Sequence, residues 1–171
     1  ISEKDKKSYL ERLNQYTDRL SILITDLFEV SKANSGNIDL EYSNINIIEF
    51  IEQVCAENEE LLQAKNLQLV THLPEKDVIV SLDGNKTYRI FENLFTNISK
   101  YALENTRVFL DVKDIGNSAV ITMKNTSKAP LDFDNDITER FVRGDKSRHE
   151  AGSGLGLAIV KSFTEVQNGT F

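Results

Sequence analysis

The chain has 171 residues, enough for one globular domain with an appended element. Its 40% hydrophobic and 27% charged content is typical of a soluble globular protein and argues against a disordered or fibrous one. Twenty basic and 27 acidic residues give a net charge of −7, which argues against general affinity for nucleic acid or anionic lipid. The single cysteine, Cys55, excludes an intramolecular disulfide, and its amphipathic setting predicts a small core residue.

The N-terminal part predicts one long helix, from about Ser8 to Asn34. Apolar side chains recur there at spacings of three and four residues, at Leu13, Tyr16, Leu20, Leu23, Leu27 and Val30, and the stripe is widened by Leu10 and Ile24. Heptad spacing over this length favours packing against another helix over a lone surface helix. Ser35-Gly36-Asn37 predicts the end of the helix.

Strands and helices then alternate. Ile38-Asp39-Leu40-Glu41-Tyr42 alternates apolar with polar residues and predicts a half-buried strand. Ser43 or Asn44 is the expected cap of a following helix, from about Ile47 to Lys65. Further expected elements are strands at Leu67 to Leu73 and Val78 to Leu82, and a helix from about Asn85 to Leu103 that turns Ile90, Leu94, Phe95 and Ile98 toward a sheet.

The C-terminal part predicts a hairpin of Val108 to Lys113 with Ala119 to Lys124, joined by a loop that contains glycine. Residues 125–151 are irregular and polar, and a last helix is expected from Ser153 or Gly154 to Gln167. This order predicts an α+β domain behind a helical module. The chain begins inside the expected first helix and stops abruptly, so we expect a fragment of a longer protein.

Two stretches predict a phosphate site. Asn93, Asn97 and Lys100 stand at i, i+4 and i+7, on one face of their helix. The run Gly152-Ser153-Gly154-Leu155-Gly156-Leu157 is a glycine-rich turn that leads into a helix, where backbone N–H groups and the helix N-terminus favour an anion. Two carboxamides and an ammonium suit a metal ion and a polyphosphate, which favours an ATP site. The stripe alone would be read as a solvated helix face.

Four motifs in order resemble those of sensor histidine kinases of bacterial two-component systems. They are Asn93-Leu94-x-x-Asn97-x-x-Lys100-Tyr101 (N-box), Asn125-x-Ser127 (first glycine box), Glu139-Arg140-Phe141-x-Arg143-Gly144-Asp145 (phenylalanine box) and Gly152 to Leu157 (second glycine box). Each motif alone is weak evidence, whereas four at the family's usual spacings are strong evidence.

The resemblance implies an α+β fold: a two-layer α/β sandwich of the Bergerat (GHKL) ATP-binding type, with a mixed sheet covered by helices, preceded by a long helix. Residues 1–36 would be the C-terminal helix of the dimerisation and histidine-phosphotransfer module, without its phosphoacceptor helix. Residues 37–171 would be the ATP-binding catalytic domain, truncated at its C-terminal strands.

The family's site residues carry over by position. Asn97 and Asn93 would bind Mg²⁺, Lys100 would face the phosphates and Tyr101 would lie near the nucleotide. Asn125 and Ser127 would lie at the adenine, with Asn125 accepting a hydrogen bond from its amino group. The nucleotide-binding run of the second glycine box would be Gly152, Ser153, Gly154, Leu155, Gly156 and Leu157. Catalytic roles would fall to Asn93, Lys100, Arg140 and Arg143, although the two arginines are open to a second reading, as solubilising residues of a polar loop.

Three departures from the family are visible. Hydrolytic relatives carry a water-activating glutamate where this chain has Asn93, and Glu92 is expected to point about 100° away. The first glycine box has lost its aspartate and both glycines. The phosphoacceptor helix is absent, and neither His72 nor His149 is expected to replace its histidine.

The resemblance implies transfer of the γ-phosphoryl group of Mg·ATP to a histidine on the missing helix, for relay to an aspartate of a cognate response regulator. It also implies a homodimer through the Leu13–Val30 helix and a cytoplasmic domain of a parent anchored in the bacterial membrane; no nucleic-acid partner is expected. Two alternatives remain: an ATP-hydrolysing conformational machine of the same fold, and a signalling scaffold that binds no nucleotide.

Overall fold

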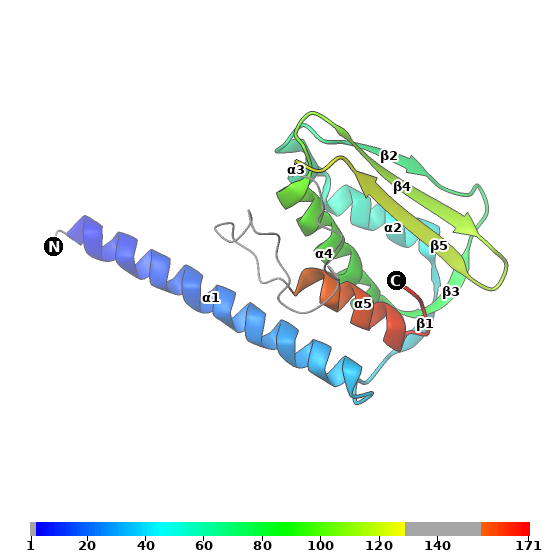
Figure 1. Ribbon diagram of the computed structural model, residues 1–171, viewed down its shortest axis with the longest axis horizontal. Helices are drawn as coiled ribbons and strands as arrows, with labels where there is room; N and C mark the ends of the chain where they lie inside the picture. Colours follow the sequence, from blue (N-terminus) through cyan, green and yellow to red (C-terminus); the bar gives the residue numbers. More distant parts are fainter. Residues whose placement is uncertain (1–2, 129–154) are drawn as a thin grey trace.

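The computed structural model describes residues 3–128 and 155–171. Its elements in chain order are α1 (Glu3–Asn34), β1 (Tyr42–Asn46), α2 (Ile47–Glu57), α3 (Glu59–Gln63), β2 (Gln68–His72), β3 (Ile79–Asp83), α4 (Gly84–Tyr101), β4 (Arg107–Asp114), β5 (Ala119–Asn125) and α5 (Gly156–Val166). Helix α1 extends away from a domain in which helices and strands form two layers (Figure 1). No helix within the described ranges is both long enough and apolar enough to cross a membrane.

Helix α1 is the predicted long helix, and it ends where the sequence indicates. Gly36 takes a φ of +70°, and its N–H donates to the Ala33 carbonyl at 3.1 Å, which closes the last turn. Only the C-terminal end of the apolar stripe is covered, because Val30 and Ala33 pack against α5. The earlier part of the stripe is exposed, at Leu10, Leu13, Tyr16, Leu20 and Ile24.

The first predicted strand is shifted. Strand β1 begins at Tyr42, where the prediction ended, and pairs antiparallel with β3. The apolar alternation from Ile38 onward has a different cause, since Ile38 packs against the α1–α5 contact and the segment up to Glu41 pairs with no strand in the described part of the chain. The predicted cap is also wrong: Asn46 caps α2, accepting a hydrogen bond from Ile48 N–H at 3.2 Å.

The helix predicted from Ile47 to Lys65 is two helices. It breaks at Asn58, whose Nδ2 donates to the Val54 carbonyl at 2.8 Å and whose backbone ψ of 5° departs from the α-helical value. Asparagine side chains compete for backbone groups in this way, so a helix that contains one in its interior is easily interrupted. Cys55, predicted to be a core residue, is only half-buried.

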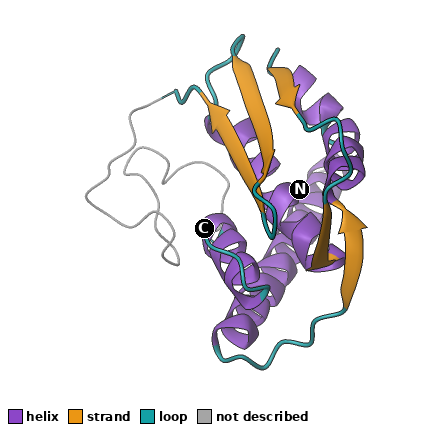
Figure 2. Ribbon diagram, turned by 90° about the vertical axis from the view of Figure 1, so that its right-hand side faces the viewer, coloured by secondary structure: helices purple, strands orange, loops and turns teal. Residues whose placement is uncertain are grey.

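The strands form two sheets, drawn as separate groups in Figure 2: an antiparallel pair β1–β3, and a three-stranded sheet in the order β2–β4–β5. Strand β2 runs parallel to β4, and β4 runs antiparallel to β5. The β4–β5 connection is the predicted hairpin, with Gly116 at a φ of +87° in its loop. The expected α+β architecture, a mixed sheet covered by helices, is therefore confirmed.

The main core lies between the inner face of the three-stranded sheet and helices α2 and α4. Phe91 and Phe95 of α4 and Val108 and Leu110 of β4 are almost completely buried there. A second cluster joins α5 to the end of α1. Ile90 belongs to that second cluster, so the prediction that it faces the sheet is wrong, whereas Phe95 and Ile98 do belong to the sheet-facing core.

Candidate functional site

Helix α4 presents its amide side chains directly to the start of α5. A Cβ built on Gly156, the first residue of α5, would lie 3.2 Å from Asn93 Oδ1 and 3.5 Å from both Nδ2 and Oδ1 of Asn97. The polar stripe and the end of the glycine-rich turn, 63 residues apart in sequence from Asn93 to Gly156 (156 − 93), therefore meet in space. Any side chain at position 156 would occupy the space between them.

The hydrogen bonds of Asn93 leave its oxygen available. Its Nδ2 donates to the Arg89 carbonyl one turn earlier, at 2.8 Å, so its Oδ1 is the atom that faces Gly156. The side chain of Asn97 has no hydrogen-bond partner among the described residues, and both asparagines are half-buried. Two neutral oxygens in a partly desolvated position are the hard donors that Mg²⁺ accepts, and they leave room for water and phosphate oxygens.

Lys100 follows Asn97 by nearly one turn, close to the C-terminal end of α4, and is half-buried. Its backbone carbonyl accepts a weak hydrogen bond from Lys65 Nζ at 3.5 Å. Two lysine side chains therefore approach this end of the helix, in a protein whose net charge is −7.

The first glycine box lies beside the end of the N-box. Lys128 N–H donates to the Tyr101 carbonyl at 3.0 Å, Leu103 N–H donates to the Thr126 carbonyl at 2.8 Å, and Ala102 forms an isolated bridge with Ser127. These bonds hold the segment after β5 against the end of α4.

The side chain of Asn125 lies on the inner face of the sheet. Asn125 ends β5 opposite the buried Val108, and directly opposed residues share a face. Asn125 itself is exposed. Tyr101, at the end of α4, is also at the surface, with 36% of its area accessible.

The second glycine box is only partly described. The side chain of Leu155 is buried in the cluster between α1 and α5, and its carbonyl accepts a hydrogen bond from Ile159 N–H at 2.9 Å, whereas Leu157 is half-buried. The remaining predicted site residues lie outside the described residues: Arg140, Arg143, Gly152, Ser153 and Gly154.

Glu92 lies where the helical spacing predicts, away from the site. It is exposed, and its carboxylate pairs with Arg89 Nη1 at 3.4 Å. His72 is an exposed strand residue, and its Nδ1 lies 2.6 Å from the Asp111 carboxylate on the sheet surface. Neither residue is part of the Asn93–Gly156 arrangement.

The comparisons with known proteins bear on this geometry. The family model for histidine kinase-, DNA gyrase B- and HSP90-like ATPases matches residues 82–171, which is more than half of the chain. The chain belongs to this ATPase family. The match includes α4, the β4–β5 hairpin and α5, the elements that carry the amide stripe, the first glycine box and Gly156.

Within the ATPase family the similarity is to sensor histidine kinases. The sensor protein kinase WalK of Staphylococcus epidermidis is 31% identical over 167 residues, which cover 95% of this chain and 27% of the relative. The chain thus spans about a quarter of the length of such relatives. The full-length ShkA structure in complex with AMPPNP matches with a TM-score of 0.79 and 22% identity, over 95% of this chain and 34% of that chain. The histidine kinase ThkA, in complex with the response regulator protein TrrA, matches with a TM-score of 0.69 and 19% identity. The match covers 99% of this chain and 47% of the ThkA chain.

A polar network that sequence reasoning missed holds the two site helices of this ATPase domain together. The carboxylate of Asp83 is 3% exposed and accepts backbone N–H groups of Lys86 and Glu41, both at 2.9 Å. The Asp83 N–H donates to Gln167 Oε1 at 2.7 Å, and Thr87 Oγ1 donates to the same oxygen at 3.3 Å. Asp83 before the helical pattern is an N-cap signal; the role of Gln167 has no signal in the sequence.

A second missed network joins α1 to α4. Asp26 and Glu29 of α1 face Lys86 and Arg89 of α4: Arg89 pairs with Asp26, and Lys86 Nζ lies 3.0 Å from Glu29 Oε1. Burial raises the pKa of Asp26, and this effect is larger than the lowering by the Arg89 charge. The two acids are three residues apart on α1 and the two bases are three residues apart on α4, so the sequence does contain a complementary charge pattern.

Proposed function

We propose that this chain is the ATP-binding catalytic portion of a sensor histidine kinase and binds Mg·ATP between α4 and the start of α5. The observation that carries the proposal is the approach of Gly156 to Asn93 and Asn97. A glycine at the start of a helix gives a phosphate access to backbone N–H groups, and the facing amide oxygens give its counterion two ligands.

Asn97 Oδ1 and Asn93 Oδ1 are the proposed protein ligands of Mg²⁺. Bound Mg²⁺ would neutralise charge on the phosphate oxygens and fix their orientation. Lys100, on the same side of α4, adds a positive charge at the phosphates. The first glycine box, held against Tyr101 by backbone hydrogen bonds, would form the adenine end, with Asn125 and Ser127 as its polar groups.

The proposed reaction is phosphoryl transfer to a histidine in a segment outside this chain. The lone pair of an imidazole nitrogen forms a bond to the γ-phosphorus as the bond from that phosphorus to the bridging oxygen breaks, and ADP leaves with the electron pair. The chain's task is to orient the triphosphate and offset its charge. Arg140 and Arg143 are the proposed cations for charge that develops on the transferred group.

Hydrolysis is disfavoured by the residues at this site. Asn93 stands where hydrolytic relatives have a catalytic glutamate, and a carboxamide cannot remove a proton from water. Glu92 pairs with Arg89 on another side of the helix. The site is therefore suited to hold ATP until an acceptor arrives.

The remaining expectations form part of the same proposal. Residues 1–36 would be a helix of the dimerisation module, with the Leu13–Val30 stripe, exposed in its earlier part and covered by α5 at Val30, as its pairing face, and residues 37–171 the catalytic domain. A response regulator would receive the phosphoryl group, supported by the structural similarity to ThkA in its complex with TrrA. The parent would be anchored in the bacterial membrane, with this part on the cytoplasmic side.

The test begins with nucleotide binding. A non-hydrolysable ATP analogue is titrated into the chain with and without Mg²⁺, for the wild type, Asn97→Ala and the matched control Asn14→Ala, an exposed helical asparagine far from the site. We expect Mg²⁺-dependent binding that only Asn97→Ala weakens, by at least roughly tenfold, or ~1.4 kcal/mol. Absence of binding at millimolar ligand would support the scaffold alternative.

Transfer is then assayed with the chain extended upstream to include the missing helix. The proposal expects label from [γ-³²P]ATP on a histidine of that helix, and none in the Asn97→Ala protein. Steady release of phosphate without labelled protein would favour the hydrolytic alternative.

A further inference from the structure

Strand β2 is an edge strand with an unpaired side within the described residues. Gln68 N–H donates to the Thr106 carbonyl at 3.0 Å, and Gln68 lies opposite Arg107 of β4. In a parallel ladder, residues that bond the neighbouring strand alternate with residues whose N–H and C=O point away. Leu69 and Thr71 therefore direct their backbone groups to the open edge.

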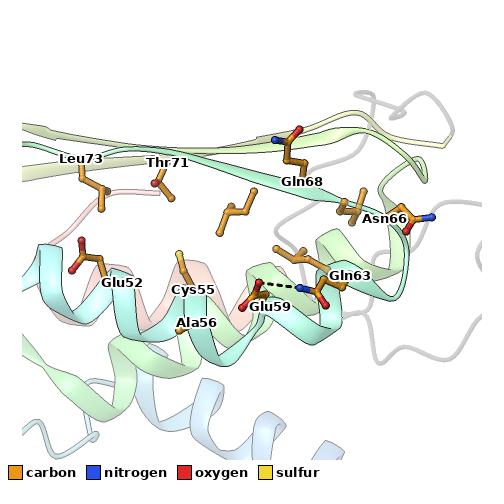
Figure 3. A pocket seen from close by; sticks show the side chains of 12 residues that line it. Glu52, Cys55, Ala56, Glu59, Gln63, Asn66, Gln68, Thr71 and Leu73 are labelled. Carbon is orange, nitrogen blue, oxygen red and sulfur yellow. Dashed lines mark hydrogen bonds between the residues drawn. The ribbon is translucent and has the colours of Figure 1, made fainter.

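A cavity of about 890 Å³ lies directly under this edge, between β2 and helices α2 and α3. Figure 3 shows Thr71 and Leu73 on the strand side and Cys55 and Ala56 on the helix side of the opening. The side chain of Leu69, like that of Thr71, lines the cavity. The two residues with free backbone groups thus also supply side chains to the adjoining hollow.

The walls of this cavity combine leucines with acidic residues. Leu62, Leu67 and Leu69 give it apolar surface, and Glu52 and Glu59 stand on its helix side (Figure 3). Glu59 accepts a neutral hydrogen bond from Gln63 at 2.9 Å, and no salt bridge reaches either glutamate from elsewhere in the described part of the chain. The site therefore offers two uncompensated negative charges beside an apolar hollow.

We propose that the β2 edge and its cavity form a docking site for an extended segment of a partner protein, with apolar and basic side chains. The segment would add to the sheet beside β2, with main-chain bonds to Leu69 and Thr71. Every second residue of the segment would face the cavity: apolar side chains among these would enter it, and lysine or arginine side chains on the same face would pair with Glu52 and Glu59. The site is separate from the amides of α4, so it is a surface for recruitment or regulation and has no part in phosphoryl transfer.

Cys55 provides a built-in reporter for occupancy. It is the only cysteine of the chain and lines the cavity. Burial, aided by the nearby Glu52 charge, raises the pKa of its thiol to about 11, so alkylation is slow enough to follow. A peptide in the cavity would slow this alkylation further.

The probe is a short labelled peptide that repeats valine, threonine, lysine and threonine, so that valine and lysine side chains share the face that meets the cavity; its binding is measured by fluorescence anisotropy at physiological salt. Two control peptides are the same repeat with glutamate in place of lysine, and the valine–lysine peptide with alternate backbone nitrogens methylated, which removes donors on one edge. We expect the valine–lysine peptide to bind and to protect Cys55, and each control to bind at least roughly tenfold more weakly. The methylated peptide tests the strand addition without altering the protein.

Protein variants test the same contacts. Thr71→Pro removes an outward N–H that the β2–β4 ladder does not use, and Thr71→Val retains it. Glu59→Lys replaces a negative charge at the cavity with a positive one, whereas Glu60→Lys makes the same change at an exposed neighbour outside the cavity. We expect Thr71→Pro and Glu59→Lys to weaken peptide binding roughly tenfold, with Thr71→Val and Glu60→Lys close to wild type.

Mg·ATP binding is measured in parallel and should be unchanged in all four variants. Loss of the docking-site proposal can therefore be told apart from loss of the proposed kinase function. Equal binding of the methylated and unmethylated peptides would overturn the strand addition. Equal losses in Glu59→Lys and Glu60→Lys would reduce the interaction to general charge attraction and overturn the site.

Discussion

Replacing Gly156 with alanine should separate nucleotide binding from fold stability. The added Cβ would lie 3.2 Å from Asn93 Oδ1, closer than ordinary van der Waals contact, and 3.5 Å from Asn97. Asn93 must therefore yield by a few tenths of an ångström. Gly156 begins α5 and has no left-handed backbone, so alanine is compatible with its conformation.

The two effects on stability nearly cancel. Gly→Ala at a compatible position stabilises a protein by about 0.4–1 kcal/mol, because it lowers the conformational entropy of the unfolded chain. The close contact with Asn93 offsets part of this gain. We expect an unfolding free energy within about 1 kcal/mol of wild type, which corresponds to a shift of about 2–4 °C in the melting temperature. Mg·ATP affinity should fall at least about tenfold, or ~1.4 kcal/mol, because the methyl group fills the space between the amides and the backbone.

Gly84→Ala is the matched control. Gly84 begins α4 as Gly156 begins α5, and its Cβ would meet Ile45 Cδ1 at 3.3 Å, a similar contact with no site residue. Calorimetric titration with a non-hydrolysable analogue and thermal melts are measured on both variants. Wild-type affinity in a folded Gly156→Ala protein would refute the placement of the phosphates against Gly156.

Three further outcomes are expected. Asn46→Ala removes the cap of α2 and should lower the free energy of urea unfolding by about 1 kcal/mol; no change would show that the Asn46 cap contributes nothing to stability. Phe95→Ala opens the main core and should cost about 3–5 kcal/mol in the same measurement, and a loss below that range would mean that the surrounding side chains collapse into the space. Hydrogen bonds from Lys124 and His72 lower the pKa of Asp111 in the folded protein. The ionised Asp111 therefore stabilises the fold fully at pH values above its ordinary pKa, and this stabilisation is lost as pH falls through its pKa in the folded protein. Asp111→Asn should therefore flatten the acid limb of the stability curve, and an unchanged limb would contradict this assignment.

The element types in this chain were largely predictable because most of its periodic patterns agree with local end signals. Gly36 ends α1 and the glycine-containing loop joins β4 to β5, as the sequence indicates. The failures occur where tertiary pairing decides. The alternation from Ile38 to Tyr42 reads as a strand, yet a strand exists only where another backbone bonds to it, and β3 pairs with residues from Tyr42 onward.

In the candidate site too, local sequence patterns predict some features and tertiary packing decides the others. Helical spacing alone places Asn93, Asn97 and Lys100 on one face, but only the fold shows Gly156 against them. The buried Asp83–Gln167 contact has no local signal, because its partners come from two helices whose packing the sequence does not state. Residue types thus predict what a site can bind, and topology decides which parts meet.

The buried acid on α1 provides a test of which electrostatic effect dominates between α1 and α4. Asp26 is 8% exposed and pairs with Arg89, with Glu29 nearby on its own helix and Lys86 bound to Glu29. Loss of hydration raises its pKa above the ordinary 3.8, the Arg89 charge and hydrogen bond lower it, and the Glu29 charge raises it again. Hydration loss is the largest of these effects, so the net shift is upward.

An upward shift fixes the sign of the pH dependence. Between the ordinary and the raised pKa, the folded protein retains a proton that the unfolded chain has lost, so stability at this position falls as pH rises. Asp26→Asn cannot ionise, and its stability relative to wild type should therefore increase with pH from about pH 4 upward. Urea unfolding at several pH values measures this difference, with Asp18→Asn, an exposed site on the same helix, as the control. A relative stability that instead decreases with pH would show that the Arg89 guanidinium outweighs the lost hydration, and that the ionised pair stabilises the contact between α1 and α4.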